Sequence, residues 1–371
     1  MTATRFAIVG GGWRAAFYLR VAAALPERFE VSGLLSRDAA RRAAIASEFA
    51  VATPETLDDL LAGDPAFVVV STPWPETPVL IAELAGRGVA VLAETPPAPD
   101  DAGLRALAPL ATTGRIQVAE QYQYQPLHAA RLQLVRSGRL GTVSQARVSA
   151  AHGYHGVDLI RRFLGLEREP LTITAHRFVS PIVASPDRAG PPADERIVES
   201  DQVVAFLDAG DRLGVYDFSP DQYFSWVRAS RVLIRGERGE LHGRTVRNLL
   251  DHRTPAIGEL VRHDAGHDGN LEGYHHVGIT LGDTWLYRNP FAPARLADDE
   301  IAVATCLGRM AEWLEGGPDV CSLADAAQDH HIGLAIEEAA RTGRSVTTRG
   351  HVWDAPADGS GPTHGRGMLG R

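Results

Sequence analysis

Short runs of apolar residues alternate with helix-like patterns along residues 1–120. Residues 6–9 and 67–70 are continuous apolar runs bounded by turn residues, which is typical of strands buried on both faces. Two further strands and four helices are expected around them, with strands at 29–35 and 89–93 and helices at 15–25, 38–49, 56–61 and 79–86. This alternation predicts βαβ units and a doubly wound parallel sheet.

Beyond Glu120 the pattern changes to alternating apolar and polar positions. Strands without intervening helices are expected from Gly141 onward, at 143–150, 171–179, 202–207, 213–218 and 231–236. Such a series favours an antiparallel sheet with one face covered by helices. The Pro/Gly-rich stretch 180–193 is expected to be a long loop. Helical periodicity returns at 298–314 and 323–342.

These patterns predict two domains and a tail. Residues 1–120 form an α/β domain, and residues 121–355 form a second, α+β domain on a mostly antiparallel sheet. Residues 356–371 are rich in Gly, Pro and small polar residues and are expected to be poorly ordered. A length of 371 residues suits two domains of ordinary size.

Composition narrows the classes of function. With 37 basic and 46 acidic residues the formal net charge is −9, so the chain lacks the positive surface that nucleic acid or an anionic membrane requires. Two cysteines, Cys306 and Cys321, are too few for a disulfide framework or a thiolate metal cluster. No apolar run approaches the roughly 20 residues that cross a bilayer, and the first residues show no secretion signal. We therefore expect a cytoplasmic protein with no nucleic-acid or membrane partner.

A glycine-rich turn follows the first expected strand. Gly10, Gly12 and Ala15 match the pattern G-x-G-x-x-[GA] directly after a strand and at the start of a helix. Small residues allow a tight turn, a close approach of the backbone to a pyrophosphate, and tight packing of helix on strand. The N–H groups at the helix N-terminus then bind the phosphates. The turn predicts a dinucleotide site, and a glycine turn without a ligand is the alternative.

The end of the second strand bears on the choice between NAD and NADP. An Asp or Glu is expected there for NAD, about 20 residues beyond the glycines. Ser36 occupies that position and Arg37 follows it, and a hydroxyl beside a guanidinium suits a 2′-phosphate. Asp38 either reaches a ribose or caps the next helix, with Arg37 then a solvated surface charge. We expect NADP or NAD, with NADP favoured.

Four stretches resemble the Gfo/Idh/MocA oxidoreductase family, which includes glucose–fructose oxidoreductase and inositol dehydrogenase. They are the glycine turn and residues 68–73, 91–96 and 153–165. The resemblance extends from residue 6 to near residue 346. It implies an N-terminal Rossmann domain and a C-terminal domain whose large sheet holds a sugar-like substrate. The same sheet often mediates oligomer contacts in the family, so a homodimer or homotetramer is expected.

The resemblance also implies where the cofactor is held. Residues 72–74 end a central strand beside the nucleotide, and residues 94–96 stand where relatives have Glu-Lys-Pro. The predicted cofactor-binding residues are Gly10, Gly11, Gly12, Trp13, Arg14, Ser36, Arg37, Thr72, Pro73, Trp74, Glu94, Thr95 and Gln121.

Two positions depart from the family's pattern. Thr95 stands where relatives have the lysine that reaches the nicotinamide and helps to move the substrate proton. A threonine hydroxyl is no general base near neutral pH. The family's D-x-G-x-H-x-x-D pattern keeps Gly153, His155 and Asp158, but Ala151 replaces its first Asp. The ordinary mechanism therefore does not carry over unchanged.

His155 is the expected general base. It matches the family's catalytic histidine, and an unperturbed imidazole titrates nearest to the working pH. His152 and Tyr154 are candidates to replace the missing Lys and Asp, and a structural hydrogen bond is the alternative for both.

Weaker signals remain open beside these. Gln121 or Tyr122 contacts a ligand or packs at the domain junction. His152 and His155 form an H-x-x-H pair, but the spacing specifies no third ligand, so no metal is expected. Two clusters either line the substrate site or are ordinary surface and core residues: Tyr274, His275 and His276, and Asp217, Tyr223 and Trp226.

Three functions are compatible with these residues. The leading one is an NAD(P)-dependent oxidoreductase that transfers a hydride between nicotinamide and a hydroxyl or keto carbon of a sugar, glycoside or cyclitol. The second is a redox-neutral NAD-dependent glycosidase, in which oxidation, elimination, hydration and reduction follow in turn. The third is a non-catalytic dinucleotide-binding sensor, which the loss of Lys and Asp favours and the retention of His155 disfavours.

Overall fold

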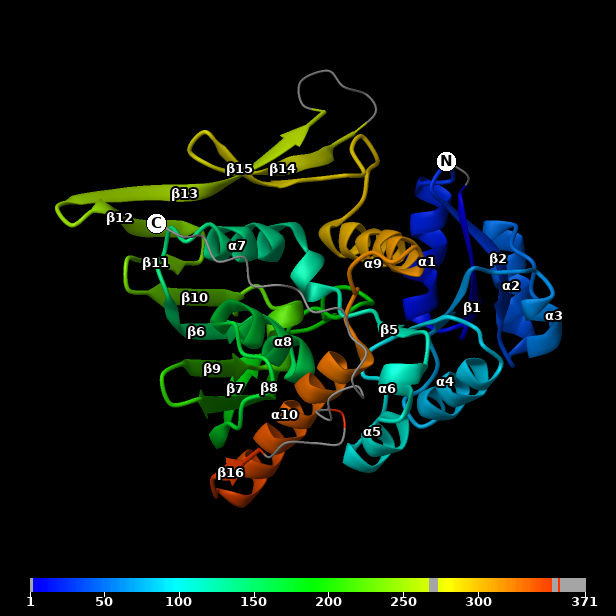
Figure 1. The fold of residues 1–371 in the computed structure, drawn as a ribbon, viewed down its shortest axis with the longest axis horizontal. Coiled ribbons are helices and arrows are strands. Elements are labelled where there is room, and N and C mark those ends of the chain that lie inside the picture. The colour runs from blue at the N-terminus through cyan, green and yellow to red at the C-terminus, as the bar shows by residue number, and fades with distance from the viewer. Residues whose placement is uncertain (1–2, 267–272, 349–352, 354–371) are drawn as a thin grey trace, which may run out of the picture.

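The computed structural model describes residues 3–266, 273–348 and 353 (Figure 1). Its N-terminal part is a five-stranded parallel sheet with the strand order β2-β1-β3-β4-β5. The strands are β1 (Thr4–Val9), β2 (Phe29–Leu35), β3 (Phe67–Val70), β4 (Val91–Ala93) and β5 (Ile116–Val118).

Helices cover both faces of this sheet because alternate residues of each strand point to opposite sides. Phe6 and Ile8 of β1 belong to one apolar cluster with α1, whereas Ala7 and Val9 belong to another with α4. The helices of this part are α1 (Trp13–Ala24), α2 (Ala39–Phe49), α3 (Leu57–Leu61), α4 (Thr77–Gly86), α5 (Asp101–Leu107) and α6 (Leu110–Thr113).

Two helices from the end of the chain return to this sheet. The apolar side of α9 (Asp298–Leu314) joins the cluster that contains α1. Helix α10 (Leu323–Thr342) packs its first turns against the opposite face, and its later turns contact the second sheet. Helix α10 therefore packs against both sheets and lies between the N-terminal and C-terminal parts (Figure 1).

An eleven-stranded sheet forms the C-terminal part, in the order β15-β14-β13-β12-β11-β10-β6-β9-β8-β7-β16. Neighbouring strands are antiparallel except β6 and β9, which run parallel. The strands are β6 (Val143–Ser149), β7 (Thr172–Val183), β8 (Ile197–Asp208), β9 (Leu213–Phe218), β10 (Arg231–Gly236), β11 (Gly239–His242), β12 (Thr245–Asp251), β13 (Thr254–Ala265), β14 (His275–Leu281), β15 (Thr284–Arg288) and β16 (Val346–Thr347).

Helices cover one face of this sheet and leave the other open. Helices α7 (Pro126–Arg136), α8 (Gly153–Leu164) and α10 share one apolar cluster with the strands. On the strands, Phe178, Phe206, Ile257 and Val261 remain exposed. The open face therefore presents apolar side chains that no described segment covers.

The predicted fold class is confirmed, because a parallel doubly wound sheet is followed by a mostly antiparallel one. The loop expected at 180–193 is wrong in its first part, since residues 180–183 pair with residues 197–200 and the hairpin loop spans 184–196. The sequence patterns do not predict β11 to β15 or the two-residue strand β16, because charged and turn residues interrupt their apolar alternation. The tail expected at 356–371 lies outside the described residues.

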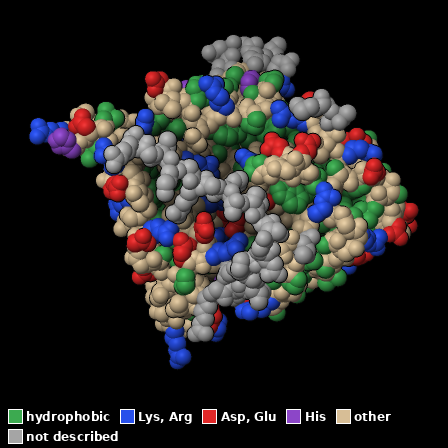
Figure 2. Space-filling model, in the orientation of Figure 1, with side chains coloured by type: hydrophobic (Ala, Val, Ile, Leu, Met, Phe, Trp, Pro, Cys, Tyr) green, Lys and Arg blue, Asp and Glu red, His purple; other side chains and the backbone are tan. Residues whose placement is uncertain are grey.

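The surface gives no sign of a membrane-spanning element within the described part of the chain. None of its helices combines the length and the apolar character that a bilayer crossing needs. Basic and acidic side chains are interspersed over the face in Figure 2.

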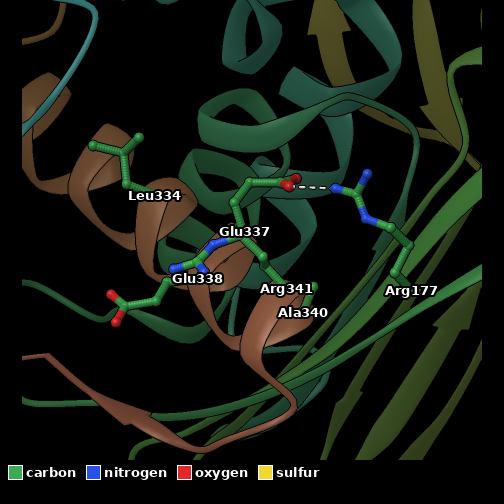
Figure 3. A pocket seen from close by; sticks show the side chains of 6 residues that line it. All are labelled: Arg177, Leu334, Glu337, Glu338, Ala340 and Arg341. Carbon is green, nitrogen blue, oxygen red and sulfur yellow. Dashed lines mark hydrogen bonds and ion pairs between the residues drawn. The ribbon is translucent and has the colours of Figure 1, made fainter.

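A groove lies between β7 and α10. It is lined by Arg177, Leu334, Glu337, Glu338, Ala340 and Arg341 (Figure 3). Arg177 pairs with Glu337 there at 2.5 Å, and none of the predicted site residues lines it.

Candidate active site

The glycine turn leaves an open helix N-terminus. Gly10 has a φ of +121°, and a Cβ there would lie 1.9 Å from the Ser71 carbonyl oxygen, so only glycine fits. A Cβ on Gly12 would meet no atom within 4 Å, which leaves space above the turn. Helix α1 has no capping side chain and no acidic residue in its first turn, so its first N–H groups remain available to an anion. The turn therefore fits the pyrophosphate of a dinucleotide.

The second residue of the turn is held from the end of β2. A Cβ on Gly11 would lie 2.8 Å from the Ser36 hydroxyl oxygen, so the two residues are close neighbours. The Nε of Arg41 donates to the Gly11 carbonyl oxygen at 2.7 Å. Arg41, which sequence reasoning does not single out, therefore helps to shape the turn.

The charged residues after β2 are already partnered. The Arg37 side chain is 82% exposed and pairs with Glu76 at 2.6 Å. Asp38 accepts the backbone N–H of Arg41 at 3.0 Å and so caps α2. Of the two roles considered for Asp38, the helix cap is the one that the structure places.

The remaining predicted residues near the turn lie at the surface and at the end of β3. Trp13 and Trp74 are 53% and 48% exposed. The guanidinium of Arg188, from the β7–β8 loop, lies 3.9 Å from the centre of the Trp13 ring, which is close enough for a cation–π contact. The Thr72 hydroxyl and the Pro73 carbonyl oxygen contact the first residue of α4 at 3.0 and 3.3 Å.

Three of the predicted cofactor-binding residues, Arg14, Glu94 and Gln121, are joined by hydrogen bonds. Arg14 Nε donates to Glu94 Oε1 at 2.7 Å, and the Tyr18 hydroxyl donates to the same oxygen. Arg14 also donates to the side-chain oxygen of Gln121. Burial opposes the charge of Arg14, but the Glu94 carboxylate outweighs it and raises the pKa of Arg14 above its ordinary value. Glu94 is thereby engaged in an ion pair that joins α1 to the ends of β4 and β5.

Two pairs of parallel strands bring the catalytic candidates to one place. Strands β4 and β5 are parallel neighbours, so Thr95 and Glu120, which follow them, lie at the same edge of the first sheet. Strands β6 and β9 are parallel neighbours in the second sheet. His152 therefore meets Tyr223 of the short helix η2 (Pro220–Tyr223), which follows β9. The carboxyl ends of parallel strands are the usual position of an active site in such folds.

His155 forms a buried pair with Glu120. Its Nδ1 lies 2.6 Å from Glu120 Oε2, and the two side chains are 8% and 3% exposed. Burial lowers the pKa of His155 to about 3 and raises the pKa of Glu120 to about 7, because water reaches neither group. One proton therefore lies between Nδ1 and Oε2 near neutral pH.

The position of that proton decides what the outer nitrogen of His155 can do. When Glu120 is ionised, the imidazole proton is on Nδ1 and Nε2 is free to accept a proton. When Glu120 is protonated, it donates to Nδ1 and the imidazole proton is on Nε2. Among the described residues no hydrogen-bond partner holds this Nε2, so His155 is suited to act as a general base or acid.

Tyr154 and His152 lie directly beside this pair. His152 Nε2 is 3.2 Å from the Tyr154 hydroxyl, which donates to the Thr95 carbonyl oxygen at 3.4 Å. The Tyr154 and His155 rings are 4.5 Å apart at their centres. Burial lowers the pKa of His152 to about 3 and raises that of Tyr154 above its ordinary value. The structure thus brings the three predicted catalytic side chains together.

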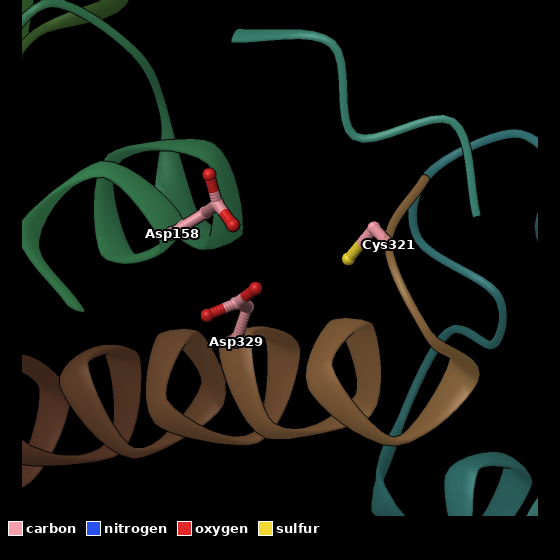
Figure 4. Close-up of side chains that lie close together, drawn as sticks. All are labelled: Asp158, Cys321 and Asp329. Atoms are coloured by element: carbon pink, nitrogen blue, oxygen red, sulfur yellow. The ribbon is translucent and has the colours of Figure 1, made fainter. Parts of the chain in front are cut away.

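One cluster among the described residues has the composition of a metal site. The ligand atoms of Asp158, Cys321 and Asp329 lie within 4.8 Å of one another in the interior (Figure 4). Arg162 binds Asp158 at 2.7 Å and Arg161 binds Asp329 at 2.5 Å, so each carboxylate already faces a cation. Burial raises the pKa of Asp158 to about 6 and that of Asp329 above its ordinary value, which favours a shared proton. These residues do not fit a metal ion, and their ion pairs join α8 to α10.

The members of the two weaker clusters, around His276 and around Tyr223, lie in different surroundings. Asp217 is buried in β9 and pairs with two arginines, and Trp226 is 79% exposed in a loop. His276 is buried and pairs with a carboxylate of β13 at 3.0 Å, whereas Tyr274 is exposed. Of these clusters, only Tyr223 contacts the catalytic candidates.

Sequence reasoning does not single out Glu120. The residue follows β5 directly, and its partner His155 lies 35 positions further along the chain. The available signal is an acidic residue at the carboxyl end of a buried parallel strand, where functional side chains gather. Its buried carboxyl group is recognisable only once the two sheets are placed together.

The N-terminal part of the chain matches a known protein family. Residues 4–122 match the GFO_IDH_MocA model, described as an oxidoreductase family with an NAD-binding Rossmann fold. This match places the domain of residues 4–122 in the Gfo/Idh/MocA oxidoreductase family. The resemblance inferred from the glycine turn and from residues 68–73 and 91–96 is confirmed. Residues 4–122 are therefore an NAD-binding Rossmann domain of the kind found in this oxidoreductase family. No curated protein matches the chain.

Solved structures share the fold over nearly the whole chain. GenD2 from gentamicin A biosynthesis, in complex with NAD, has a TM-score of 0.63 at 20% identity, covering 94% of this chain and 97% of that one. A myo-inositol dehydrogenase from Corynebacterium glutamicum has a TM-score of 0.63 at 18% identity, covering 94% and 100%. Levoglucosan dehydrogenase, in complex with NADH and L-sorbose, has a TM-score of 0.65 at 17% identity, covering 94% and 99%. At these identities the likeness concerns the fold.

No other lysine takes the place of the family lysine that Thr95 replaces. The sequence contains no lysine at any position, so no other segment supplies an amine near Thr95. The side chain whose hydroxyl lies against the Thr95 backbone is Tyr154. Ala151 is fully buried, and the polar groups nearest to it along the chain are those of His152.

Proposed function

We propose that the protein is a dehydrogenase that transfers a hydride between a nicotinamide cofactor and a hydroxyl or keto carbon of a sugar, glycoside or cyclitol. The observation that carries this proposal is the pair of His155 and Glu120, set beside Tyr154 at the edge where the glycine turn opens. The sugar dehydrogenases and cyclitol dehydrogenases among the fold neighbours support the substrate class. We take the protein to act in the cytoplasm.

The chain's own residues supply binding and proton transfer. NAD, when bound, supplies the carbon that accepts or gives the hydride. The N–H groups at the start of α1 bind its pyrophosphate. His155 takes the hydroxyl proton at Nε2 while Glu120 holds the proton at Nδ1. The Tyr154 hydroxyl donates a hydrogen bond to the same substrate oxygen and fixes its position.

A panel assay tests this proposal. The protein is incubated with NAD or NADP and a set of cyclitols, sugars and glycosides that includes myo-inositol and levoglucosan, and the nicotinamide absorbance band is followed. Reduction of the cofactor with at least one member is expected. A protein that binds the nucleotide and reduces it with no member would favour the sensor function instead.

Replacing Thr95 by alanine should have a mild effect. The contact with Tyr154 uses the backbone carbonyl oxygen, which alanine keeps. We expect kcat/KM to fall by less than about a hundredfold, which corresponds to about 2.7 kcal/mol. Tyr154→Phe, which removes the hydroxyl itself, serves as the comparison and should cost more. A larger loss in Thr95→Ala would show that the threonine side chain takes part in proton transfer.

We further propose that NADP is preferred over NAD, because Arg37 follows β2, the strand after which Rossmann domains bind the ribose of the dinucleotide. Its guanidinium is exposed, and its ion-pair partner among the described residues is Glu76, so a phosphate can take over the ion pair. Arg37→Ala should weaken NADP binding by about tenfold and leave NAD binding unchanged in a fluorescence titration. Arg105→Ala, which also removes an exposed, ion-paired arginine, is the control. Equal affinities for NADP before and after the Arg37 change would contradict the preference.

The redox-neutral glycosidase is the second candidate. It needs one group to take a proton from carbon and another to protonate the leaving oxygen. His155 with Glu120 and Tyr154 with His152 are two such groups. To distinguish the glycosidase from the dehydrogenase, the purified protein is denatured and any released nucleotide is identified by mass. Stoichiometric nucleotide, with aglycone released from a nitrophenyl glycoside and no net reduction, would favour this candidate over the dehydrogenase.

We also propose that the open face of the second sheet joins copies of this chain into a homodimer or homotetramer. Phe178, Phe206, Ile257 and Val261 are apolar and exposed there. Phe178 and Phe206 lie on the neighbouring strands β7 and β8, and Ile257 and Val261 lie on β13, so a second copy would cover apolar side chains toward both ends of this sheet.

A further inference from the structure

The hydrogen bonds around His152 form a row in which each side chain donates to the next. The Tyr223 hydroxyl oxygen accepts the backbone N–H of His152 at 3.1 Å and the hydroxyl of Tyr122 at 3.3 Å, which occupies both of its lone pairs. Its own proton therefore points to Nδ1 of His152, at 2.6 Å. A neutral imidazole that accepts at Nδ1 carries its proton on Nε2. This N–H faces the Tyr154 hydroxyl oxygen at 3.2 Å.

The same direction continues toward the substrate site. Tyr154 donates to the Thr95 carbonyl oxygen at 3.4 Å, which is long for an O–H···O bond, so a substrate oxygen can replace that acceptor. Burial and the neighbouring His155 and His330 lower the pKa of His152 to about 3. The chain of donors is therefore neutral at its centre.

We propose that Tyr122, Tyr223, His152 and Tyr154 form a hydrogen-bond relay, in which Tyr223 is the positioning residue that fixes the His152 tautomer. This relay rests on the proposed function. When a substrate carbonyl is reduced, its oxygen takes the one proton that the step requires from Nε2 of His155, and the Tyr154 hydroxyl donates a hydrogen bond to the same oxygen. The Nε2–H of His152 donates to the Tyr154 oxygen and the Tyr223 hydroxyl donates to Nδ1, so the relay keeps the Tyr154 proton directed at the substrate. When the alcohol is oxidised, the same donors hold the substrate oxygen while His155 takes its proton.

The relay is separate from the pair of His155 and Glu120. The rings of His152 and His155 are 4.9 Å apart at their centres and nearly perpendicular, and their nitrogens bind different partners. The two histidines therefore have different roles: His155 transfers the substrate proton, and His152 directs the Tyr154 hydroxyl toward the substrate oxygen.

Imidazole NMR tests the tautomer without any substrate. The full-length protein is labelled with ¹⁵N-histidine, and His152→Gln identifies the signals of His152. We expect a neutral ring with its proton on Nε2, and a partial or complete shift of the proton to Nδ1 in Tyr223→Phe. A wild-type ring protonated at Nδ1, or a ring that Tyr223→Phe leaves unchanged, would overturn the proposal.

Kinetics test the relay itself. With the best substrate of the panel, Tyr223→Phe should lower kcat by about 10-fold to 100-fold, leave KM within about twofold, and change the solvent isotope effect. The control is Tyr216→Phe, whose hydroxyl accepts the Gly153 N–H at 2.8 Å but does not touch the imidazole. An equal loss in both variants would assign Tyr223 a structural role and overturn the relay. If the wild type turns over no substrate, the proposed function fails, and the NMR result still decides the tautomer.

Discussion

Replacing His155 by alanine is expected to reduce hydride transfer by about 10³-fold or more and to leave nucleotide affinity unchanged within about twofold. The reason is that Nε2 of His155 is the group that takes or gives the substrate proton, while the phosphates are bound at the start of α1. Single-turnover changes in nicotinamide absorbance measure the first quantity, and fluorescence titration with NAD measures the second.

The control for this variant is His276→Ala. His276 is also buried and also pairs with a carboxylate, Asp264, at 3.0 Å, so the two variants remove the same kind of interaction. His276 lies on β14, which β13, β12, β11 and β10 separate from β6. We expect it to affect the free energy of unfolding and not the chemical step. A His155→Ala enzyme that keeps more than about a tenth of the wild-type rate would show that another group is the base.

The rate of alcohol oxidation should rise with pH through about 7, because burial raises the pKa of Glu120 to about 7. Below that pH Glu120 is protonated and donates to Nδ1, so Nε2 of His155 carries a proton and cannot accept the substrate's. Above it Glu120 is ionised, Nδ1 carries the proton and Nε2 is free. The expected oxidation rate falls about tenfold for each pH unit below 7, and the reverse reduction shows the opposite slope.

Glu120→Gln should remove this pH dependence. Glutamine keeps the size and the hydrogen bond to His155 but does not titrate, so kcat/KM should be lower than in the wild type and flat from about pH 5.5 to 8.5. The control is Gln117→Ala. It changes a buried polar residue of β5 whose side chain binds Asp319 and not His155. A Glu120→Gln enzyme with the wild-type pH profile would assign the titration to a different group.

The fold follows closely from local patterns. Strand β3 is an unbroken apolar run, and α9 and α10 have clear helical periodicity, so their predicted bounds of 67–70, 298–314 and 323–342 agree with the structure. The β12–β15 region escapes prediction because its strands are half-exposed, and pairing between neighbouring strands and packing of α7 against β14 and β15 hold them in place.

The candidate site is less accessible from the sequence. His152, Tyr154 and His155 are neighbours in one motif, so their proximity follows from the start of α8. Glu120 and Tyr223 reach the same place only because β5 and β9 end at particular edges of two different sheets. Contacts between segments 35 and 71 positions apart depend on that arrangement, which spacing along the chain does not encode.

The charge pairs around the cofactor site show the same limit. The sequence places Arg37 after β2, but its ion pair with Glu76 forms only because β2 and β3, on either side of β1, end at the same edge of the sheet. The interaction of Arg14 with Glu94 likewise joins segments that are 80 positions apart.

Deuterium transfer tests the central claim most directly. NADH and NADPH deuterated at the reactive nicotinamide carbon are incubated with the protein and a pool of keto-sugars and keto-cyclitols, and the products are analysed by mass. We expect deuterium on the carbinol carbon of at least one product with the wild type and none above background with His155→Ala. Saturation with the cofactor and no deuterium in any product, with no aglycone released from glycosides, would contradict it and leave a protein that binds the dinucleotide without using it.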